Sequence, residues 1–339
     1  MSRKLITIST IMTLMSTSVI ADVPNVAADI APIHSLVSRV MDGVGAPKLI
    51  VQSGASPHGY RLRPSEAKAL QDADHVFWMG EELTPWLDSA IGTLASKASV
   101  TTLLDQQGVI LHDFREGALF EAHDHSAHGD DDHDDHDDHD DHDDHKDHDD
   151  HDDHDDHDDH KDHDDHDDHG SHDPHAWLSP ENAKLWLNII ASKLSVSDPE
   201  NAATYFMNAA AGQAEIEAMI AEVKATLKPV QGGKFVVFHD AYQYFENDFD
   251  FYASGAISLS DSSDPSPARI EKVQKRIRDE GIQCVLAEPQ FKKGLVATVM
   301  EGSDATASVI DPLGTELEAG PKLYTQLIKN MAKTLRNCL

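Results

Sequence analysis

Residues 47–79 read PKLIVQSGASPHGYRLRPSEAKALQDADHVFWM, and their pattern indicates the fold class. The stretch begins with a short β-rich run over 47–52 and ends with another over 75–79. Between them Pro64 begins a helical pattern that continues to Leu70. Proline is favoured at the first helical position, because the N–H that it lacks has no intrahelical partner there. A strand, a helix and a second strand in this order predict parallel strands covered by helices.

The same alternation continues on both sides of this stretch. Residues 199–227 form one long helical pattern, which at 1.5 Å per residue would be roughly 40 Å long and would suit a rod that joins two lobes. Both halves contain a Pro-Ser helix start followed by a strand that ends in Glu, at Glu81 and at Glu288. We therefore predict an α/β protein with two similar lobes, whose parallel sheets are covered by helices and which one long rigid helix joins. The further β-rich runs lie at 25–30, near Val100, and at 234–238, 282–287 and 308–310.

The first 21 residues are predicted to be an export signal. Arg3 and Lys4 precede an apolar run from Leu5 to Ile20, and cleavage is expected after Ala21. The run is short and rich in Ser and Thr for a spanning helix, which disfavours an uncleaved membrane anchor. We expect the mature chain to lie outside the cytoplasm.

The remaining chain divides into three predicted parts. An N-terminal lobe covers residues 22–198 and contains an inserted segment over 123–172. The linking helix covers 199–228, and the C-terminal lobe covers 229–339. These boundaries follow the strand and helix patterns and the abrupt change of composition at the insertion.

The chain contains two cysteines, Cys284 in an apolar run and Cys338 next to the C-terminus. Two cysteines in an oxidising compartment most often pair. We favour a disulfide that ties the C-terminal helix to a core strand, and two buried free thiols are the alternative.

The inserted segment carries most of the charge. The protein has 339 residues and a formal net charge of −34, and residues 123–172 hold 17 of its 23 His together with 26 Asp and 2 Lys. A segment with so little to bury is expected to be disordered. Neutral imidazole suits Zn²⁺, Cu²⁺ and Ni²⁺, so the segment is predicted to collect such ions loosely; a merely solubilising linker would need no His. The chain offers no basic face, which excludes nucleic acid as a partner.

The positions of the predicted strand ends indicate which of the remaining histidines are candidate ligands and which have other roles. His75 opens its strand at the wrong end for a ligand site and is expected to be structural. His34 follows a strand and is expected to line the site or to hydrogen-bond a ligand from outside. The histidines outside the insertion are His34, His58, His75, His112, His175 and His239.

Three of these histidines and one aspartate are candidate metal ligands. Ligands of open parallel sheets bind beyond the carboxyl ends of the strands. His58 lies in the loop after the first quoted strand, His239 directly follows a strand, His175 precedes a helix start, and Asp311 directly follows the last strand. Three imidazoles with one carboxylate or water suit tetrahedral Zn²⁺.

Six short motifs together resemble the ZnuA-type zinc-binding proteins of bacterial ABC importers. The motifs occur in order over nearly the whole mature chain, and the acidic His-rich insertion lies in the same place. The resemblance implies two α/β lobes joined by a rigid helix with zinc in the cleft between them, and it implies His58, His175 and His239 as ligands. The motifs are SPHGY (56–60), RPS (63–65), DPHAWLSP (173–180), FHDAY (238–242), AEPQF (287–291) and DPLG (311–314).

The fourth ligand stays open. In related metal receptors a carboxylate at the position of Asp311 binds the metal. Some zinc receptors instead have Glu directly before the first ligand histidine, where this chain has Pro57. Asp311, a water molecule and a histidine of the insertion remain. We favour Asp311, because its charge would offset that of the ion among three neutral imidazoles.

The resemblance implies a periplasmic receptor that captures Zn²⁺ and delivers it to an ABC permease, with the insertion collecting zinc. We expect a monomer and no enzymatic activity. The alternatives are a zinc buffer without transport and a zinc hydrolase with three His ligands, for which Glu288 would be the best candidate base. A manganese receptor of the same fold would use more carboxylates.

Overall fold

The computed structural model describes residues 23–115, 119–120, 172–258, 265–290 and 293–339. Within them the strands form two four-stranded sheets, and every strand pairing is parallel. The prediction of an α/β protein with parallel sheets is therefore confirmed. The predicted export signal and all of the predicted insertion except His172 lie outside the described residues.

The two sheets have the same strand order. The first sheet runs β2–β1–β3–β4 and the second runs β6–β5–β7–β8, so in each the second strand of the chain lies at the edge beside the first. The sequence did not reveal β6. The strands are β1 (Val26–Ala28), β2 (Lys48–Leu49), β3 (His75–Trp78), β4 (Ser99–Thr102), β5 (Phe235–His239), β6 (Ala256–Ser258), β7 (Cys284–Ala287) and β8 (Thr306–Val309).

Two helices begin where the sequence indicates starts, whereas the long helix predicted over 199–228 covers Ala202–Leu227. Pro64 is the first residue of α2, and Pro180 is the first residue of α4, where the Ser179 side chain accepts a hydrogen bond from Asn182 N. The helices are α1 (Ala31–Val40), α2 (Pro64–Gln71), α3 (Pro85–Leu94), α4 (Pro180–Ser197), α5 (Ala202–Leu227), α6 (Gln243–Phe249), α7 (Pro267–Glu280), α8 (Lys293–Met300) and α9 (Leu323–Cys338), with short 3₁₀ turns η2 (Ala176–Leu178) and η3 (Lys228–Val230).

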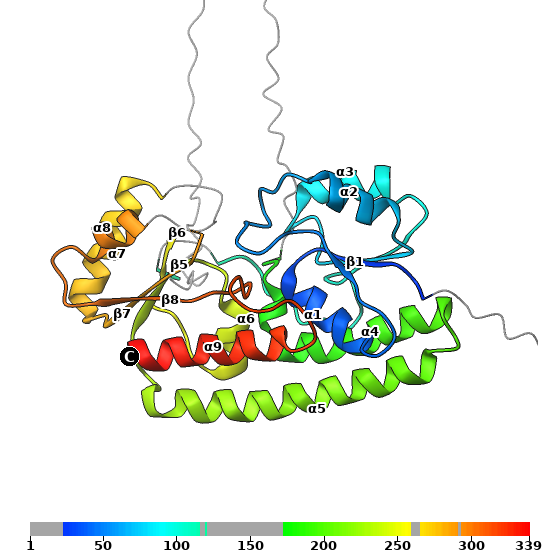
Figure 1. Ribbon diagram of the computed structural model, residues 1–339. Helices are drawn as coiled ribbons and strands as arrows, with labels where there is room; N and C mark the ends of the chain where they lie inside the picture. The colour runs from blue at the N-terminus through cyan, green and yellow to red at the C-terminus, as the bar shows by residue number, and fades with distance from the viewer. Residues whose placement is uncertain (1–22, 116–118, 121–171, 259–264, 291–292) are drawn as a thin grey trace, which may run out of the picture.

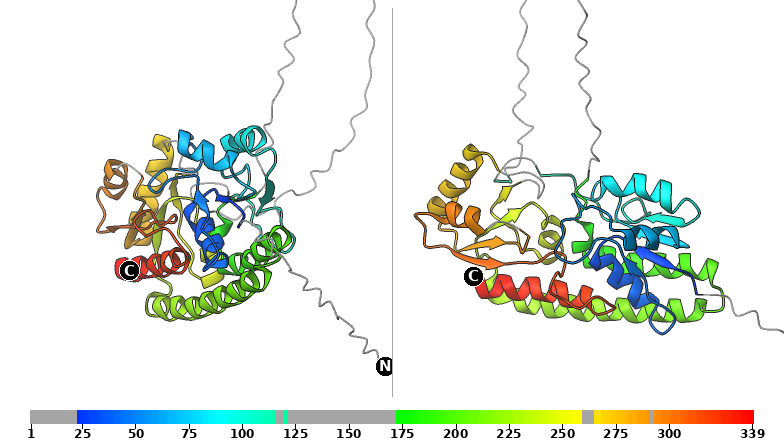
Figure 2. Two further views of the ribbon diagram at one scale, coloured as in Figure 1. Left: turned by 45° about the vertical axis from the view of Figure 1, so that its right-hand side comes forward. Right: turned by 45° about the horizontal axis from the view of Figure 1, so that its top comes forward.

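The longest described helix, α5, lies along helices of both halves. It packs against α4 and α1 beside the first sheet and against α9 beside the second (Figure 1). The views in Figure 2 keep α5 alongside α4 and α9. Its approach to α4 is close at Gly212, where an added Cβ would lie 2.9 Å from the Leu187 side chain. A helix of 26 residues spans roughly 39 Å, so α5 is long enough to support both sheets.

The largest hydrophobic core is shared by the two halves. One cluster of buried residues includes Ile33 of α1, Trp177 of η2, Leu286 of β7 and Ile328 of α9. Smaller clusters lie under the outer helices of each sheet. Because the shared core is closely packed, large relative motion of the halves would expose apolar surface.

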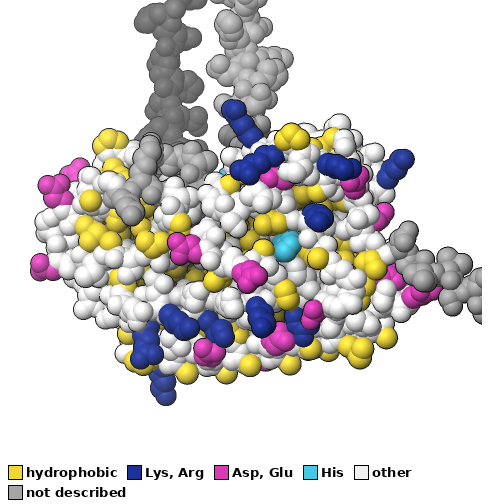
Figure 3. Space-filling model, in the orientation of Figure 1, with side chains coloured by type: hydrophobic (Ala, Val, Ile, Leu, Met, Phe, Trp, Pro, Cys, Tyr) yellow, Lys and Arg dark blue, Asp and Glu magenta, His cyan; other side chains and the backbone are white. Residues whose placement is uncertain are grey.

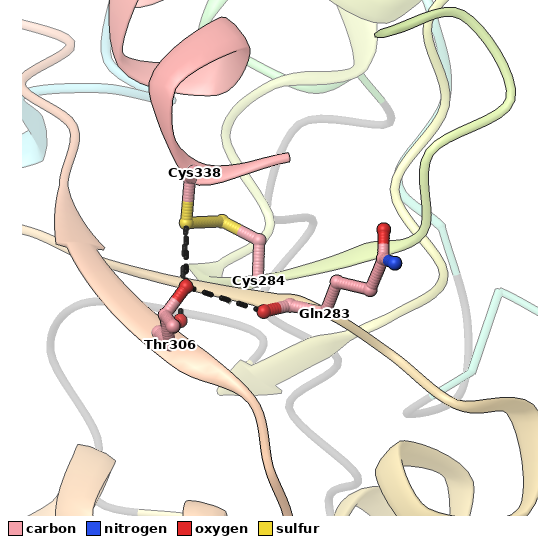
Figure 4. Close-up of a disulfide and its surroundings, with 4 residues drawn as sticks. All are labelled: Gln283, Cys284, Thr306 and Cys338. Atoms are coloured by element: carbon pink, nitrogen blue, oxygen red, sulfur yellow. Dashed lines mark hydrogen bonds between the residues drawn. A yellow bond between two sulfur atoms is a disulfide. The ribbon is translucent and has the colours of Figure 1, made fainter.

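A disulfide joins Cys284 of β7 to Cys338 at the end of α9, with the Cα atoms 5.5 Å apart (Figure 4). The predicted pairing is therefore confirmed. The Thr306 hydroxyl lies 3.7 Å from the Cys338 Sγ and hydrogen-bonds Gln283 O. The bridge ties the C-terminal helix to the middle of the second sheet.

Charged side chains of both signs are spread over the face shown in Figure 3. On this face Lys and Arg lie over α2 and α3 and along α5 and α9, with Asp and Glu among them. The strong negative charge of the sequence therefore belongs to the insertion rather than to this face. None of the helices that the structure describes is long and apolar enough to cross a bilayer.

Candidate metal centre

Three predicted ligand histidines meet between the two sheets. The His175 ring centroid lies 5.6 Å from that of His58 and 5.2 Å from that of His239. Two imidazoles on one tetrahedral Zn²⁺ have ring centroids roughly 5 Å apart, since each Zn–N bond is about 2.0–2.1 Å long. Among the described residues no three His, Cys, Asp or Glu side chains have their donor atoms arranged to hold an ion as they stand. The ring spacing suits coordination, but the donor atoms do not converge on one point.

His239 is placed by the register of the second sheet. It is the last residue of β5, and the pairing of Val237 with Leu286, continued by two residues, puts residue 239 opposite residue 288, which directly follows β7. There Glu288 Oε1 accepts a hydrogen bond from His239 Nδ1 at 2.5 Å, and Glu288 Oε2 accepts one from Gln290 Nε2 at 2.9 Å. His239 and Glu288 are both buried.

His175 is placed by a tight turn before η2. Asp173 Oδ1 accepts hydrogen bonds from the His175 backbone N–H at 2.9 Å and from its Nδ1 at 2.6 Å. Burial raises the pKa of Asp173 to about 7, against the opposing effect of the His175 N–H. Trp177 Nε1 donates to Pro312 O and the Tyr244 hydroxyl donates to Asp173 O, so this turn is bonded to residues that follow β8 and β5.

His58 reaches the centre from the first sheet. Its loop follows β2, and its backbone N–H donates to Ser56 Oγ at 3.2 Å. Trp86 of α3 donates from Nε1 to Pro57 O at 2.7 Å, and Tyr60 donates to Glu66 at 2.7 Å. His58 is half-buried, whereas His175 and His239 are buried. The centre therefore combines two buried histidines with a more accessible one from the opposite sheet.

Asp311, the predicted fourth ligand, is held by its own turn. Its Oδ1 accepts hydrogen bonds from the N–H groups of Leu313 and Gly314, and its Oδ2 accepts from the N–H and hydroxyl of Thr315. A carboxylate offers about four lone-pair sites, so a metal would have to displace one of these donors. Asp311 also lines a depression of about 670 Å³ beside α9, which the three histidines do not line.

A buried ion-pair network that the sequence did not reveal lies beside His239. The Arg115 guanidinium hydrogen-bonds Asp240, the residue after His239, and Glu246 of α6. Both carboxylates are buried, and burial raises the pKa of Glu246 to about 7 and also raises that of Asp240, against the effect of Arg115. The position of Asp240 after a predicted strand could have marked it as a candidate site residue, but the sequence does not show that Arg115 is its partner.

The segments that lead into and out of the insertion lie side by side next to the centre. Asp113 and His172 form an antiparallel bridge, and Asp173 N donates to His112 O at 2.7 Å. His172 is three residues from His175 in the chain. The C-terminal end of the insertion therefore lies close to a candidate ligand.

His34 and His75 have contacts of their own. His34 Nε2 lies 3.2 Å from Pro47 O, and burial lowers its pKa. His75, at the start of β3, hydrogen-bonds Ser197 at 2.7 Å and stacks on Phe77, and burial lowers its pKa. The contacts of His75 fit its predicted structural role.

The chain matches known proteins over most of its length. The family model described as zinc-uptake complex component A, periplasmic, matches residues 26–338. High-affinity zinc uptake system protein ZnuA of Brucella abortus is 50% identical over 314 residues, covering 93% of this chain and 91% of the relative. The protein of the same name from Paracoccus denitrificans is 45% identical over 320 residues, covering 94% of this chain and 93% of its own.

Solved structures share the fold. A crystal structure of a ZnuA superimposes with a TM-score of 0.68 at 20% identity, covering 94% of this chain and 99% of that chain. At 20% identity this structural similarity supports the fold alone. The match of the family model and the identity to the curated relatives decide the assignment: the chain belongs to the ZnuA family of periplasmic zinc-uptake components.

Proposed function

We propose that this protein captures Zn²⁺ in the periplasm with His58, His175 and His239 and delivers it to the permease of an ABC importer. The relatives that match most of the chain are named as high-affinity zinc uptake proteins, and the family is a receptor rather than an enzyme. Export with cleavage after Ala21 and action as a monomer belong to the same proposal.

The observation that carries this proposal is the meeting of three imidazoles that are far apart in the sequence. Two of them are buried, and each of these has a carboxylate at its Nδ1. Neutral nitrogen donors suit Zn²⁺ better than Mn²⁺, which prefers oxygen ligands. This donor set therefore favours a zinc receptor over a manganese receptor.

For the fourth position the hydrogen bonds of Asp311 now favour a water molecule over the carboxylate predicted from the sequence. Ligation by Asp311 would break at least one of the bonds from its turn, whereas a water ligand leaves all of them in place. Three protein ligands with one exchangeable position also suit an ion that must later be released.

The insertion is proposed to collect zinc and pass it to the centre. Its last residue, His172, is bridged to Asp113 and lies three residues from His175 in the chain, so ions bound to the insertion would be concentrated near the ordered site. A hydrolase is disfavoured because Glu288, its candidate base, already accepts hydrogen bonds from His239 and Gln290.

Zinc competition against a chelator tests the ligand assignment in the full mature chain. His239→Ala should weaken the tight site on the order of 100-fold, because about 10–16 kcal/mol of zinc binding is shared among four ligands. His75→Gln, a buried histidine on β3, is the matched control and should bind like wild type. Tight binding by His239→Ala would refute the assignment.

Growth separates an importer from a zinc buffer. A strain that lacks the protein should fail to grow when a chelator limits zinc and should grow normally in excess zinc. Sensitivity only to excess zinc would favour the buffer and contradict the proposed delivery.

A further inference from the structure

We propose that Asp173 and Glu288 are positioning residues of the zinc centre. Each holds the Nδ1 of one ligand histidine so that its Nε2 is left to bind the ion, and Glu288 also brings a negative charge, which three neutral imidazoles lack. The inference rests on the proposed function, because it takes His175 and His239 as ligands.

Glu288 is fixed at both of its oxygens. Oε1 accepts from His239 Nδ1 at 2.5 Å, and Oε2 accepts from Gln290 Nε2 at 2.9 Å. The parallel register of β5 and β7 brings the last residue of β5, His239, beside Glu288, the first residue after β7. Glu288 is 2% exposed, and water therefore does not compete for the bond.

Asp173 uses one oxygen for two bonds to the same residue. Its Oδ1 accepts from both the backbone N–H and the Nδ1 of His175, which fixes the χ angles of the ring relative to its own backbone. The backbone of Asp173 is held in turn, because its N–H donates to His112 O and its carbonyl accepts from the Tyr244 hydroxyl.

The consequence for both rings follows from the chemistry of imidazole. In a neutral imidazole one nitrogen carries the proton and the other is free to bind a metal. A carboxylate at Nδ1 places the proton there, leaves Nε2 as the donor, and raises the basicity of the ring. Both histidines are thereby prepared as Nε2 ligands before the ion arrives.

The Glu288 carboxylate also offsets part of the charge of the ion. Three neutral imidazoles and a water leave both charges of Zn²⁺ uncompensated in a largely buried site, which is unfavourable. With Asp311 engaged by its own turn, Glu288 brings a negative charge without oxygen ligation. The ligand atoms remain nitrogens, which keeps the preference for Zn²⁺ over Mn²⁺.

Two substitutions of Glu288 separate orientation from charge. Glu288→Gln keeps an oxygen that accepts from Nδ1 and loses the charge. Its new amide can donate to Gln290 Oε1, a buried oxygen with no hydrogen-bond partner in the described part of the chain, once the Gln290 amide flips. Glu288→Ala loses both the acceptor and the charge.

Zinc affinity is measured on the full mature chain by competition with a chelator at half an equivalent of zinc. Glu288→Ala should lower this affinity by about 10–100-fold, as is usual when a hydrogen-bond partner of a metal ligand is removed. Glu288→Gln should recover part of this loss. Imidazole ¹⁵N shifts of the zinc-free protein should report the Nδ1–H tautomer of His239 in wild type and Glu288→Gln and a mixture in Glu288→Ala. Asp173→Asn, which keeps an oxygen that can accept from His175 Nδ1, should likewise keep the His175 tautomer.

Asp198→Asn is the matched control, since Asp198 is a fully buried carboxylate at the α4–α5 connection, bonded to Tyr205. It should leave both zinc affinity and the tautomers unchanged. Glu288→Ala with wild-type affinity and an unchanged tautomer would overturn the positioning role alone, provided that His239→Ala weakens the tight site as expected. Tight binding by His239→Ala would overturn the ligand assignment and the positioning role together.

Discussion

Asp29 is a buried carboxylate at the end of β1 that links the stability of the fold to pH. Its side chain is 0% exposed and accepts hydrogen bonds from the backbone N–H groups of Ile30 and Met79, both at 2.7 Å. Burial raises its pKa from 3.8 to about 7, against the opposing effect of these two bonds. We predict that Asp29→Asn flattens the dependence of the free energy of unfolding on pH.

The sign and size of the effect follow from proton linkage. A carboxyl whose pKa is raised in the folded state binds its proton more tightly there, so it adds stability as the pH falls and this contribution is lost as the pH rises through the folded pKa, here about 7. Between about pH 8 and about pH 4.5 the contribution of Asp29 should change by about 3 kcal/mol, because each tenfold difference in proton affinity corresponds to about 1.4 kcal/mol.

Urea unfolding of the zinc-free protein at a series of pH values measures this difference. Asp29→Asn also loses a hydrogen-bond acceptor, but that loss is independent of pH and cancels when the slopes are compared. The exposed Asp88→Asn controls for removal of one negative charge. Wild type and Asp29→Asn curves that run parallel over this range would refute the reasoning.

Three further substitutions test the packing that supports the centre. Replacing Cys284 and Cys338 by Ser should cost about 4 kcal/mol, since the bridge closes a loop with a sequence separation of 54; unchanged urea unfolding would contradict this. Arg115→Met should cost about 3–5 kcal/mol by leaving two buried carboxylates unpaired, and a Tm equal to that of wild type would argue against the network. Gly212→Val should lower the Tm through about 1–3 kcal/mol of overpacking against Leu187, whereas a rise in Tm would show that the helices have room to separate.

Most of the fold could be predicted because buried parallel strands are short apolar runs that alternate with helical patterns. The exception, β6, is Ala-Ile-Ser after Gly255, whose φ of 152° is rarely adopted by residues other than glycine. Three residues with one β-branched side chain give no periodic signal. The strand exists because β5 offers it a paired edge, which is a tertiary effect.

Part of the candidate site could also be predicted, because its residues follow predicted strands or precede a predicted helix. His58 and His239 stand at strand ends, and His175 precedes a helix start, so topology and the family resemblance could bring them together. Which carboxylate hydrogen-bonds which imidazole depends on the strand register and on the turn at Asp173. Neither can be predicted from the local sequence. The prediction for Asp311 used its position after β8, and it could not foresee that the turn of Asp311 engages both of its oxygens.

Zinc-edge anomalous diffraction from crystals of the full mature chain with one equivalent of Zn²⁺ examines the three-histidine centre most directly. The account predicts a single strong peak about 2.0–2.1 Å from one ring nitrogen of each of His58, His175 and His239, with Nε2 as the donor atom in the last two. A strong peak elsewhere in the ordered protein, or one that touches fewer than these three rings, would contradict it.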